Sequence, residues 1–263
     1  MSKSFWPGLA FLALLPLAGN AADFASATPA PRVEYWEKRL QQINAQVEDR
    51  AALPQVKLLF VGDSITDFWL LHDNPWVQGQ KFGGAIWEAT FATPGSANYA
   101  LNVGISGDRT EHVLYRLQPK AEGGLGQLDA AELAPEFIVL MIGINNTWAP
   151  EQPVNESVFA GASAVLASLQ ARKPKARIIL QSLLPLPDAD KSRDIVRPVN
   201  TRLRALAESQ PGNCVVFLDL YPSFVDASGA QVGSFFNDGI HPNEAGYRVW
   251  RERLLAALDA ARA

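Results

Sequence analysis

The chain has 263 residues, with 23 lysines and arginines against 27 aspartates and glutamates, and a formal net charge of −4 at pH 7. A mildly acidic chain has no electrostatic reason to bind nucleic acid or an anionic lipid surface, so we expect neither partner. Its single cysteine, Cys214, excludes an internal disulfide and is typical of a small apolar core residue. The length suits one domain with a large core.

The N-terminal sequence MSKSFWPGLAFLALLPLAGNAADFASA places one lysine before an apolar run, which is followed by small residues. This order is typical of a secretory signal peptide, and the apolar run is too short to span a bilayer. We expect a signal peptide over residues 1–22, cleaved after Ala21 or Ala22, with a second candidate site after Ala27. An uncleaved membrane anchor is the alternative. Cleavage would leave a periplasmic or secreted protein without stable membrane association.

The rest of the chain shows no repeat and no low-complexity tract. Residues 23–33 are small and include proline, so we expect a flexible lead-in there. Residues 34–263 are expected to form a single domain. Two long connections, 73–97 and 118–136, are typical of functional rims or of plain insertions.

Five apolar runs of strand length alternate with helical patterns. The runs are apolar almost throughout, which favours strands buried on both faces of a parallel sheet. The alternation predicts an α/β fold of right-handed βαβ units in three layers. The runs cover residues 57–62, 98–104, 137–143, 176–185 and 214–220, and the helical patterns between them include 109–117, 156–172 and 192–210. A last helix is predicted after an Asn243 N-cap, with Tyr247, Trp250, Leu254 and Leu258 at helical spacing.

The stretch LLFVGDSITDFW, residues 59–70, leaves the first predicted strand through Gly-Asp-Ser. Either this is an ordinary strand-to-helix junction capped by Asp63 or Ser64, or Ser64 is a nucleophile at the end of a strand. In an open parallel sheet, ligands bind beyond the carboxyl ends of the strands. Gly104 follows the second predicted strand and Asn145 the third. A hydroxyl, a backbone amide and a side-chain amide at that edge are what acyl transfer requires.

A serine nucleophile also needs a base, and the chain has three histidines. His241 lies between the last strand and the last helix, three residues after Asp238, which can accept a hydrogen bond from its Nδ1–H. Such a contact fixes the tautomer and stabilises the imidazolium. Alone, Asp-x-x-His is as readily a turn, but together with Gly-Asp-Ser it favours catalysis. His72 has only Asp73 as a nearby acid, and His112 suits a helix surface or a supporting role.

Taken together, GDSIT, the glycine after the second strand, GINN and DGIHPN resemble the four sequence blocks of the SGNH (GDSL-type) hydrolase family. The blocks occur in the family's order and cover nearly the whole mature chain. NVGISGDRTEHVLYRL, followed by Gly-x-Asn-Asn, is especially similar to bacterial relatives of the platelet-activating-factor acetylhydrolase catalytic subunits. The resemblance implies a three-layer α/β/α sandwich with a flavodoxin-like, five-stranded parallel sheet in the order 2-1-3-4-5.

The resemblance also implies the site residues. Ser64 would be the nucleophile, His241 the base and Asp238 the residue that orients it. The oxyanion hole would consist of the Ser64 and Gly104 backbone amides and the Asn145 side chain. No cofactor is implied, and three scattered histidines with one cysteine do not make a metal-ligand cluster.

The chain departs from the family pattern in three places. Asn146 stands where many members have aspartate, Ile65 replaces the leucine of the family's name, and residues 118–136 are longer than expected. Ser106, in GISG, is a weak rival nucleophile because the Gly-x-Ser-x-Gly spacing of a lipase elbow is missing.

The leading hypothesis is a serine esterase that removes small acyl groups, preferably acetyl, from an O-acetylated carbohydrate. Trp69, Trp76, Trp87 and Trp148 could line a sugar-binding rim, although core packing explains at least half of them better. A lysophospholipase or thioesterase with a longer acyl channel is one alternative, and a catalytically silent glycan-binding module is another. The sequence leaves the oligomeric state open.

Overall fold

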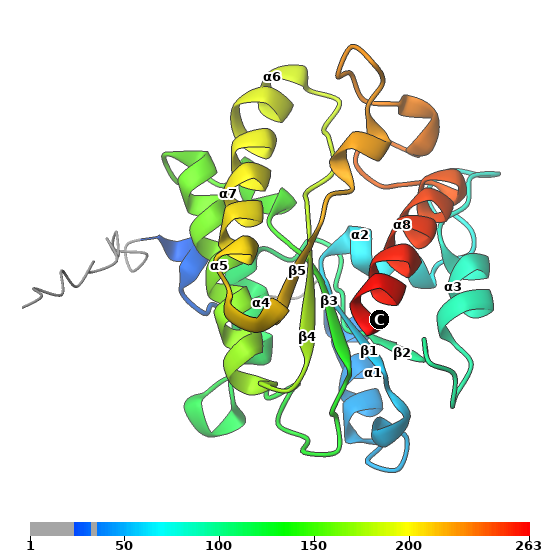
Figure 1. Cartoon of the computed structure of the whole chain (residues 1–263), viewed down its shortest axis with the longest axis vertical. Helices are drawn as coiled ribbons and strands as arrows, with labels where there is room; N and C mark the ends of the chain where they lie inside the picture. Colours follow the sequence, from blue (N-terminus) through cyan, green and yellow to red (C-terminus); the bar gives the residue numbers. More distant parts are fainter. Residues whose placement is uncertain (1–23, 33–35) are drawn as a thin grey trace, which may run out of the picture.

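A computed structural model describes residues 24–32 and 36–263, so the predicted signal peptide lies outside the described residues. Five parallel strands form one sheet in the order β2-β1-β3-β4-β5, which confirms the predicted order (Figure 1). Each strand is shorter than its apolar run, because the chain turns into the loops at either edge before the run ends. The strands are β1 (Leu58–Gly62), β2 (Ala100–Asn102), β3 (Phe137–Met141), β4 (Arg177–Gln181) and β5 (Val215–Leu218).

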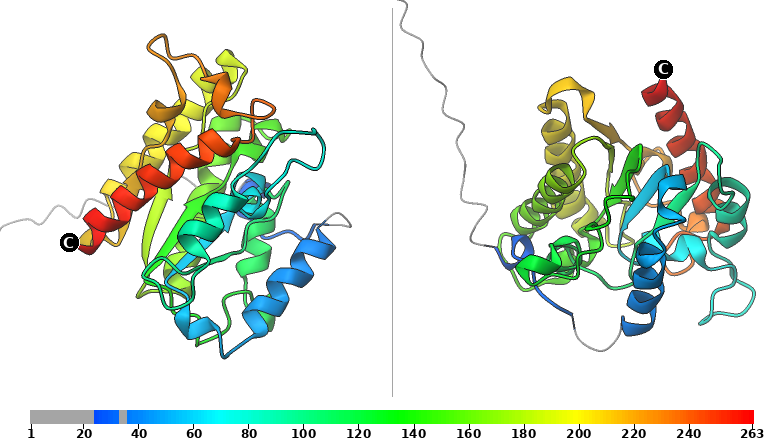
Figure 2. Two further views of the ribbon diagram at one scale, coloured as in Figure 1. Left: turned by 90° about the vertical axis from the view of Figure 1, so that its right-hand side faces the viewer. Right: turned by 90° about the horizontal axis from the view of Figure 1, so that it is seen from below.

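Helices cover both faces of the sheet and complete the predicted three-layer α/β/α sandwich (Figure 2). The layer on one face contains α4 (Thr110–Leu117), α5 (Val154–Arg172) and α7 (Arg197–Glu208), and the layer on the other contains α3 (Gly84–Phe91) and α8 (Glu244–Arg262). Within the described residues, no helix is long and apolar enough to cross a bilayer.

Three further helices lie at the margins of these layers. Helix α1 (Glu37–Glu48) lies beside β2, where Arg39 Nη2 donates to Asn102 O at 2.7 Å. The short α2 (Ser64–Asp67) follows β1, and α6 (Ala189–Lys191) precedes a π-helical turn that runs into α7. Figure 1 shows α2 at the upper edge of the sheet, below the loop that follows β5. Parallel strands bring their carboxyl ends to this one edge.

The four tryptophans of the predicted sugar-binding rim differ in their solvent exposure. Trp69 and Trp87 are buried, at 0% and 7% exposure, whereas Trp76 and Trp148 are 63% and 47% exposed. Cys214 is partly buried and packs against the core. The C-terminal helix matches its prediction, since the Asn243 side chain caps it and its four predicted apolar residues are fully buried, namely Tyr247, Trp250, Leu254 and Leu258.

The expectation of a flexible lead-in is wrong for residues 24–32, which pack against α4 and α5. Ser26 is 1% exposed. Its Oγ donates to Ser157 O at 2.8 Å, and its carbonyl accepts from Thr110 Oγ1 at 2.7 Å. The Glu151 carboxylate accepts from the Ser26 backbone N–H at 3.1 Å. Composition alone suggested a mobile segment, but small residues are also what a close approach to two helices requires.

Candidate active site

The Gly-Asp-Ser sequence is both a helix cap and a strand-end serine. A Cβ at Gly62 would lie 2.1 Å from Thr66 Oγ1 and 2.4 Å from Met141 O, so only glycine fits where β1 enters α2. The Asp63 side chain caps α2 by accepting from Ile65 N at 3.0 Å. Asp63 therefore takes the capping role, and Ser64 begins the helix directly after the strand, so the cap leaves the Ser64 side chain available as a candidate nucleophile.

The three predicted catalytic side chains form one hydrogen-bonded chain. His241 Nε2 lies 2.8 Å from Ser64 Oγ, and His241 Nδ1 lies 2.6 Å from Asp238 Oδ2. Asp238 Oδ1 accepts from the backbone N–H groups of Ile240 and His241 at 2.9 and 2.8 Å. Burial by itself would raise the pKa of Asp238, but the hydrogen bonds from His241 and Ile240 lower it to about 2. Asp238 is therefore an anion at neutral pH and can accept the hydrogen bond from His241 Nδ1.

The loop that carries Asp238 is held in place by Gln231, a side chain that the sequence analysis did not identify. Gln231 Nε2 donates to Gly239 O and to Pro185 O, each at 2.7 Å. These bonds tie the loop before α8 to the segment after β4. Nothing in the sequence around Gln231 signals this contact, because its partners are backbone carbonyls.

The backbone amide of Gly104 is already engaged. It donates to Asn102 Oδ1 at 2.8 Å, while Asn102 Nδ2 donates to Thr66 O at 2.7 Å. A backbone amide carries one hydrogen, so this bond leaves none for a substrate oxygen. The structure thus contradicts the prediction that Gly104 belongs to an oxyanion hole.

The turn after Gly104 offers a different donor. Asp108 N donates to Ile105 O at 3.1 Å, and Gly107 takes a φ of +80°, which glycine adopts without strain. Among the described residues, no acceptor faces the Gly107 N–H. Asn145 Nδ2 donates to Asp108 O at 2.7 Å, which places the predicted amide against this turn. Because an amide nitrogen carries two hydrogens, Asn145 keeps one for a ligand.

A buried ion pair supports the same turn. Asp108 and Arg116 are both fully buried, with Arg116 Nη2 2.8 Å from Asp108 Oδ2. Arg32 Nη1 lies 3.1 Å from Asp108 Oδ1 and donates to Ser106 O at 2.6 Å. Breaking a buried pair is costly because it leaves an uncompensated charge. The turn between Gly104 and Arg109 is therefore fixed by two arginines, Arg116 from the helix that follows it and Arg32 from a distant part of the chain.

The remaining candidates have structural positions. Asn146 is buried and accepts from Thr110 N at 3.0 Å, so it secures the start of α4. His112 Nδ1 accepts from Arg109 N at 3.0 Å in the cap of the same helix, and burial lowers its pKa. His72 pairs with Glu88 at 2.9 Å. No hydrogen bond of the described residues joins Ser106 to a histidine, which leaves it without a base.

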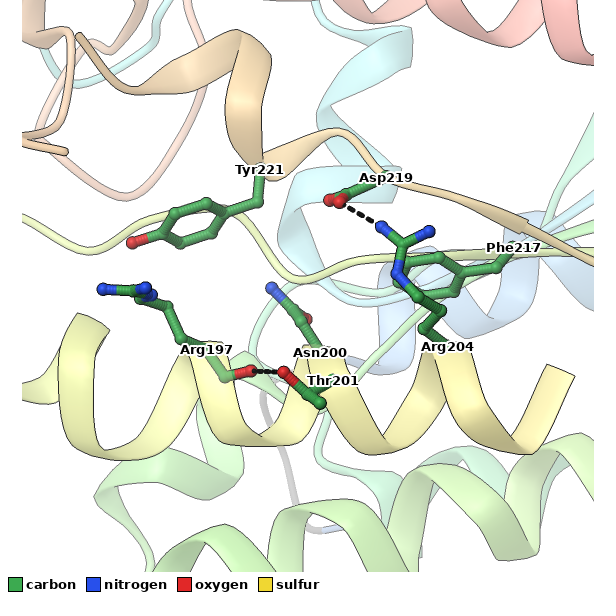
Figure 3. A pocket seen from close by; sticks show the side chains of 7 residues that line it. All are labelled: Arg197, Asn200, Thr201, Arg204, Phe217, Asp219 and Tyr221. Carbon is green, nitrogen blue, oxygen red and sulfur yellow. Dashed lines mark hydrogen bonds and ion pairs between the residues drawn. The ribbon is translucent and has the colours of Figure 1, made fainter. Parts of the chain in front are cut away.

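A hollow of about 200 Å³ between α7 and β5 does not belong to this constellation (Figure 3). Arg197 and Tyr221 face each other across it, and Arg204 is paired with Asp219. None of Ser64, Asp238 and His241 lines it. Within the described part of the chain, no group of three or more histidine, cysteine or acidic side chains is arranged to hold a metal ion.

A five-stranded parallel sheet of this order, with serine, histidine and aspartate linked at its carboxyl edge, defines the class of α/β acyl hydrolases with a serine–histidine–aspartate arrangement. The model of the GDSL-like lipase/acylhydrolase family matches residues 60–249, and the chain belongs to that family. It is a carboxylic ester hydrolase.

Similar proteins cover most of the chain. Human platelet-activating factor acetylhydrolase IB subunit alpha1 is 31% identical over 235 residues, which span 88% of this chain and 87% of the human protein. A Bacteroides fragilis structure assigned as an acylhydrolase matches with a TM-score of 0.62 at 21% identity, covering 88% of this chain and 99% of that one. A mutant of an acetyl-xylooligosaccharide esterase from Geobacillus matches with a TM-score of 0.52 at 22% identity, covering 76% of this chain and 93% of that one. The structural matches show a shared fold.

Proposed function

We propose that the protein is a serine esterase that hydrolyses acetyl esters of a carbohydrate, with Ser64 as nucleophile, His241 as base and Asp238 as the residue that orients the base. The observation that carries this proposal is the continuous chain of contacts from Ser64 Oγ through the His241 ring to Asp238, at 2.8 and 2.6 Å. The first distance is within reach for proton transfer from Ser64 to His241, and the second is a hydrogen bond that orients the ring.

In the first half-reaction, Ser64 Oγ attacks the carbonyl carbon while its proton moves to His241 Nε2. The ring keeps its Nδ1–H bond to Asp238, so the positive charge forms beside a carboxylate. Collapse of the tetrahedral intermediate breaks the ester C–O bond, and His241 gives its proton to the leaving alcohol. In the second half-reaction, His241 Nε2 removes a proton from water as the water oxygen attacks the acyl carbon. Collapse of this second tetrahedral intermediate breaks the bond between that carbon and Ser64 Oγ, His241 returns the proton to Ser64 Oγ, and acetate leaves.

The negative charge of the tetrahedral oxygen needs donors that are fixed beforehand. Ser64 N is the first amide of α2. The Gly107 N–H belongs to the turn that the bond from Ser106 N to Asp67 Oδ2, at 3.0 Å, holds against the last residue of α2, and Asn145 Nδ2 donates to the same turn. We assign these three groups to the oxyanion hole, with Gly107 in place of Gly104.

The exposed aromatic side chains support a carbohydrate substrate. Trp76 lies in the connection after β1 and Trp148 shortly after β3, so both extend from strands whose ends carry Ser64 and Asn145. Lys191 Nζ lies over the Trp148 ring, 4.4 Å from its centre. An exposed aromatic ring presents a flat apolar face that suits a sugar ring. The Geobacillus protein, which shares the fold, is an acetyl-xylooligosaccharide esterase.

The test combines acyl specificity with labelling. We expect 4-nitrophenyl acetate to be hydrolysed faster than 4-nitrophenyl octanoate, and Ser64→Ala to lower kcat by roughly a thousandfold or more while the protein stays folded. Ser106→Ala is the matched control, and it should keep most of the activity. A fluorophosphonate should label Ser64.

Other outcomes favour the competing interpretations. A label on Ser106 would overturn the choice of nucleophile. Faster turnover of the octanoate ester would favour a lysophospholipase or thioesterase. Glycan binding without turnover of either ester would favour a silent binding module.

A further inference from the structure

An apolar groove of about 510 Å³ lies between α1 and the segments that carry the site. One side is formed by α1 with Lys38 and Gln42, and the other by the chain after α2 with Leu71 and Trp76. Ser106, in the turn after Gly104, and Phe68, in the chain after α2, also line it. The groove is therefore lined in part by segments that follow β1 and β2, at the carboxyl edge of the sheet.

Phe68 connects this groove to the catalytic histidine. Its ring centre lies 4.8 Å from that of His241 and 5.4 Å from that of Trp76. His241 must protonate the leaving alcohol, so that alcohol lies on the histidine side of the reacting carbon. Because Phe68 contacts His241 and also lines the groove, an alcohol that leaves beside His241 lies next to the Phe68 part of the groove.

The charges in the groove do not cancel. Arg39 is held by Asp67, with Nε 2.8 Å from Oδ1, and it also donates to the carbonyl of Asn102. Lys38 is exposed and has no carboxylate partner among the described residues. The groove thus presents one uncompensated cation in a chain whose net charge is −4.

We propose that this groove binds the alcohol part of the ester, and that this alcohol is an acidic sugar whose carboxylate contacts Lys38. The proposal rests on the proposed esterase function and specifies its substrate. Trp76 supplies an exposed ring for the sugar face, and Lys38 supplies a point charge for the carboxylate. Lys38 is here a specificity-determining residue for the acetylated alcohol, with no part in the bond-breaking steps.

The experiment uses two acetyl esters that differ in one charge. One is an O-acetylated glucuronic acid and the other is its methyl ester, which has the same ring without the anion. For the wild-type enzyme we expect kcat/KM to be roughly fivefold higher for the acid, the scale of an exposed ion pair. The difference should lie mainly in KM, because the contact is present before and during the reaction.

The variants test whether Lys38 causes that preference. Lys38→Gln keeps most of the side chain and should bring the ratio of kcat/KM values close to one, and Lys38→Glu should reverse it. Lys175→Gln removes the same charge ahead of β4, at the opposite edge of the sheet, and should leave the ratio unchanged. Because the ratio is taken within each variant, a partial loss of folded enzyme does not alter it.

Four results would overturn the proposal. The first is an equal kcat/KM of the wild type for the two sugars, and the second is a preference for the acid that survives Lys38→Gln. The third is faster turnover of acetylated glycerol 3-phosphate than of either sugar. The fourth is turnover of 4-nitrophenyl acetate while neither sugar is hydrolysed. Failure of the esterase function itself is distinguishable, since 4-nitrophenyl acetate would then not be hydrolysed either.

Discussion

Asp63 is a buried carboxyl group whose charge should oppose folding. It is 1% exposed, and its Oδ2 has no hydrogen-bond partner among the described residues. Burial raises its pKa from 3.8 to about 7. A folded pKa above the unfolded one means that the folded protein binds more protons between these values, so stability falls as the pH rises from about 4 to about 7. Above that window, the full cost of the charge is about 4 kcal/mol.

Replacing Asp63 by asparagine should remove this pH dependence while keeping the helix cap. The asparagine Oδ1 can still accept from Ile65 N, but its Nδ2 would be a buried donor without an acceptor, which costs about 1–3 kcal/mol at any pH. We therefore expect Asp63→Asn to be less stable than wild type at pH 4 and more stable at pH 8. The difference in unfolding free energy between variant and wild type should change by about 4 kcal/mol across this range.

Urea unfolding followed by tryptophan fluorescence, at pH 4 and pH 8, measures this change. Asp188→Asn is the matched control, because Asp188 caps α6 from an exposed position by accepting from Asp190 N at 3.0 Å. Its relative stability should change by less than about 1 kcal/mol between the two pH values, the scale for a solvated charge at a helix end. A difference between Asp63→Asn and wild type that is the same at both pH values would refute the reasoning.

Three further predictions concern the oxyanion hole, the loop before α8 and export. Asn145→Ala should lower kcat roughly a hundred- to a thousandfold with little change in KM, because the donor acts on charge that develops in the transition state. A stable Asn145→Ala enzyme with near-normal kcat would exclude that role, and Asn145→Asp should be at least as damaging. Gln231→Leu removes the bond to Gly239 O and should lower kcat by roughly tenfold through displacement of the catalytic loop; an unchanged kcat would show that the loop holds its position without it. We also propose that the protein is exported, so N-terminal sequencing should find a chain that begins near Ala22 or Asp23, and a cytoplasmic form with its leader intact would contradict this.

The sheet and the linked trio could be predicted because each rests on a local signal. Continuous apolar runs specify strands buried on both faces, and Gly-Asp-Ser and Asp-x-x-His combine a turn with the chemistry itself. The order of the strands came from the family resemblance. Four motifs in order were a stronger guide than any single spacing.

Two parts of the prediction failed because they depend on contacts between distant residues. Gly104 and Gly107 are both glycines next to the second strand, and only the Asn102 side chain decides that the Gly104 amide is engaged. Likewise, the composition of residues 24–32 gives no indication of Ser157 or Thr110, more than eighty residues away, which hold Ser26 in place. The ambiguity among the tryptophans was of the same kind, since only packing separates Trp69 from Trp76.

The docking of residues 24–32 bears on how the protein should be truncated for recombinant work. A boundary drawn at the start of α1 would look natural, yet it would delete Arg32 and with it two bonds that hold the turn beside Ser64. It would also delete Ser26 from between α4 and α5. The same contacts distinguish the two candidate signal-cleavage sites. Cleavage after Ala27 would discard Ser26, whereas cleavage after Ala22 would retain the whole segment. An affinity tag is best attached upstream of Phe24, so that the purified protein keeps the segment whose Arg32 and Ser26 contact the turn after β2 and the helices α4 and α5.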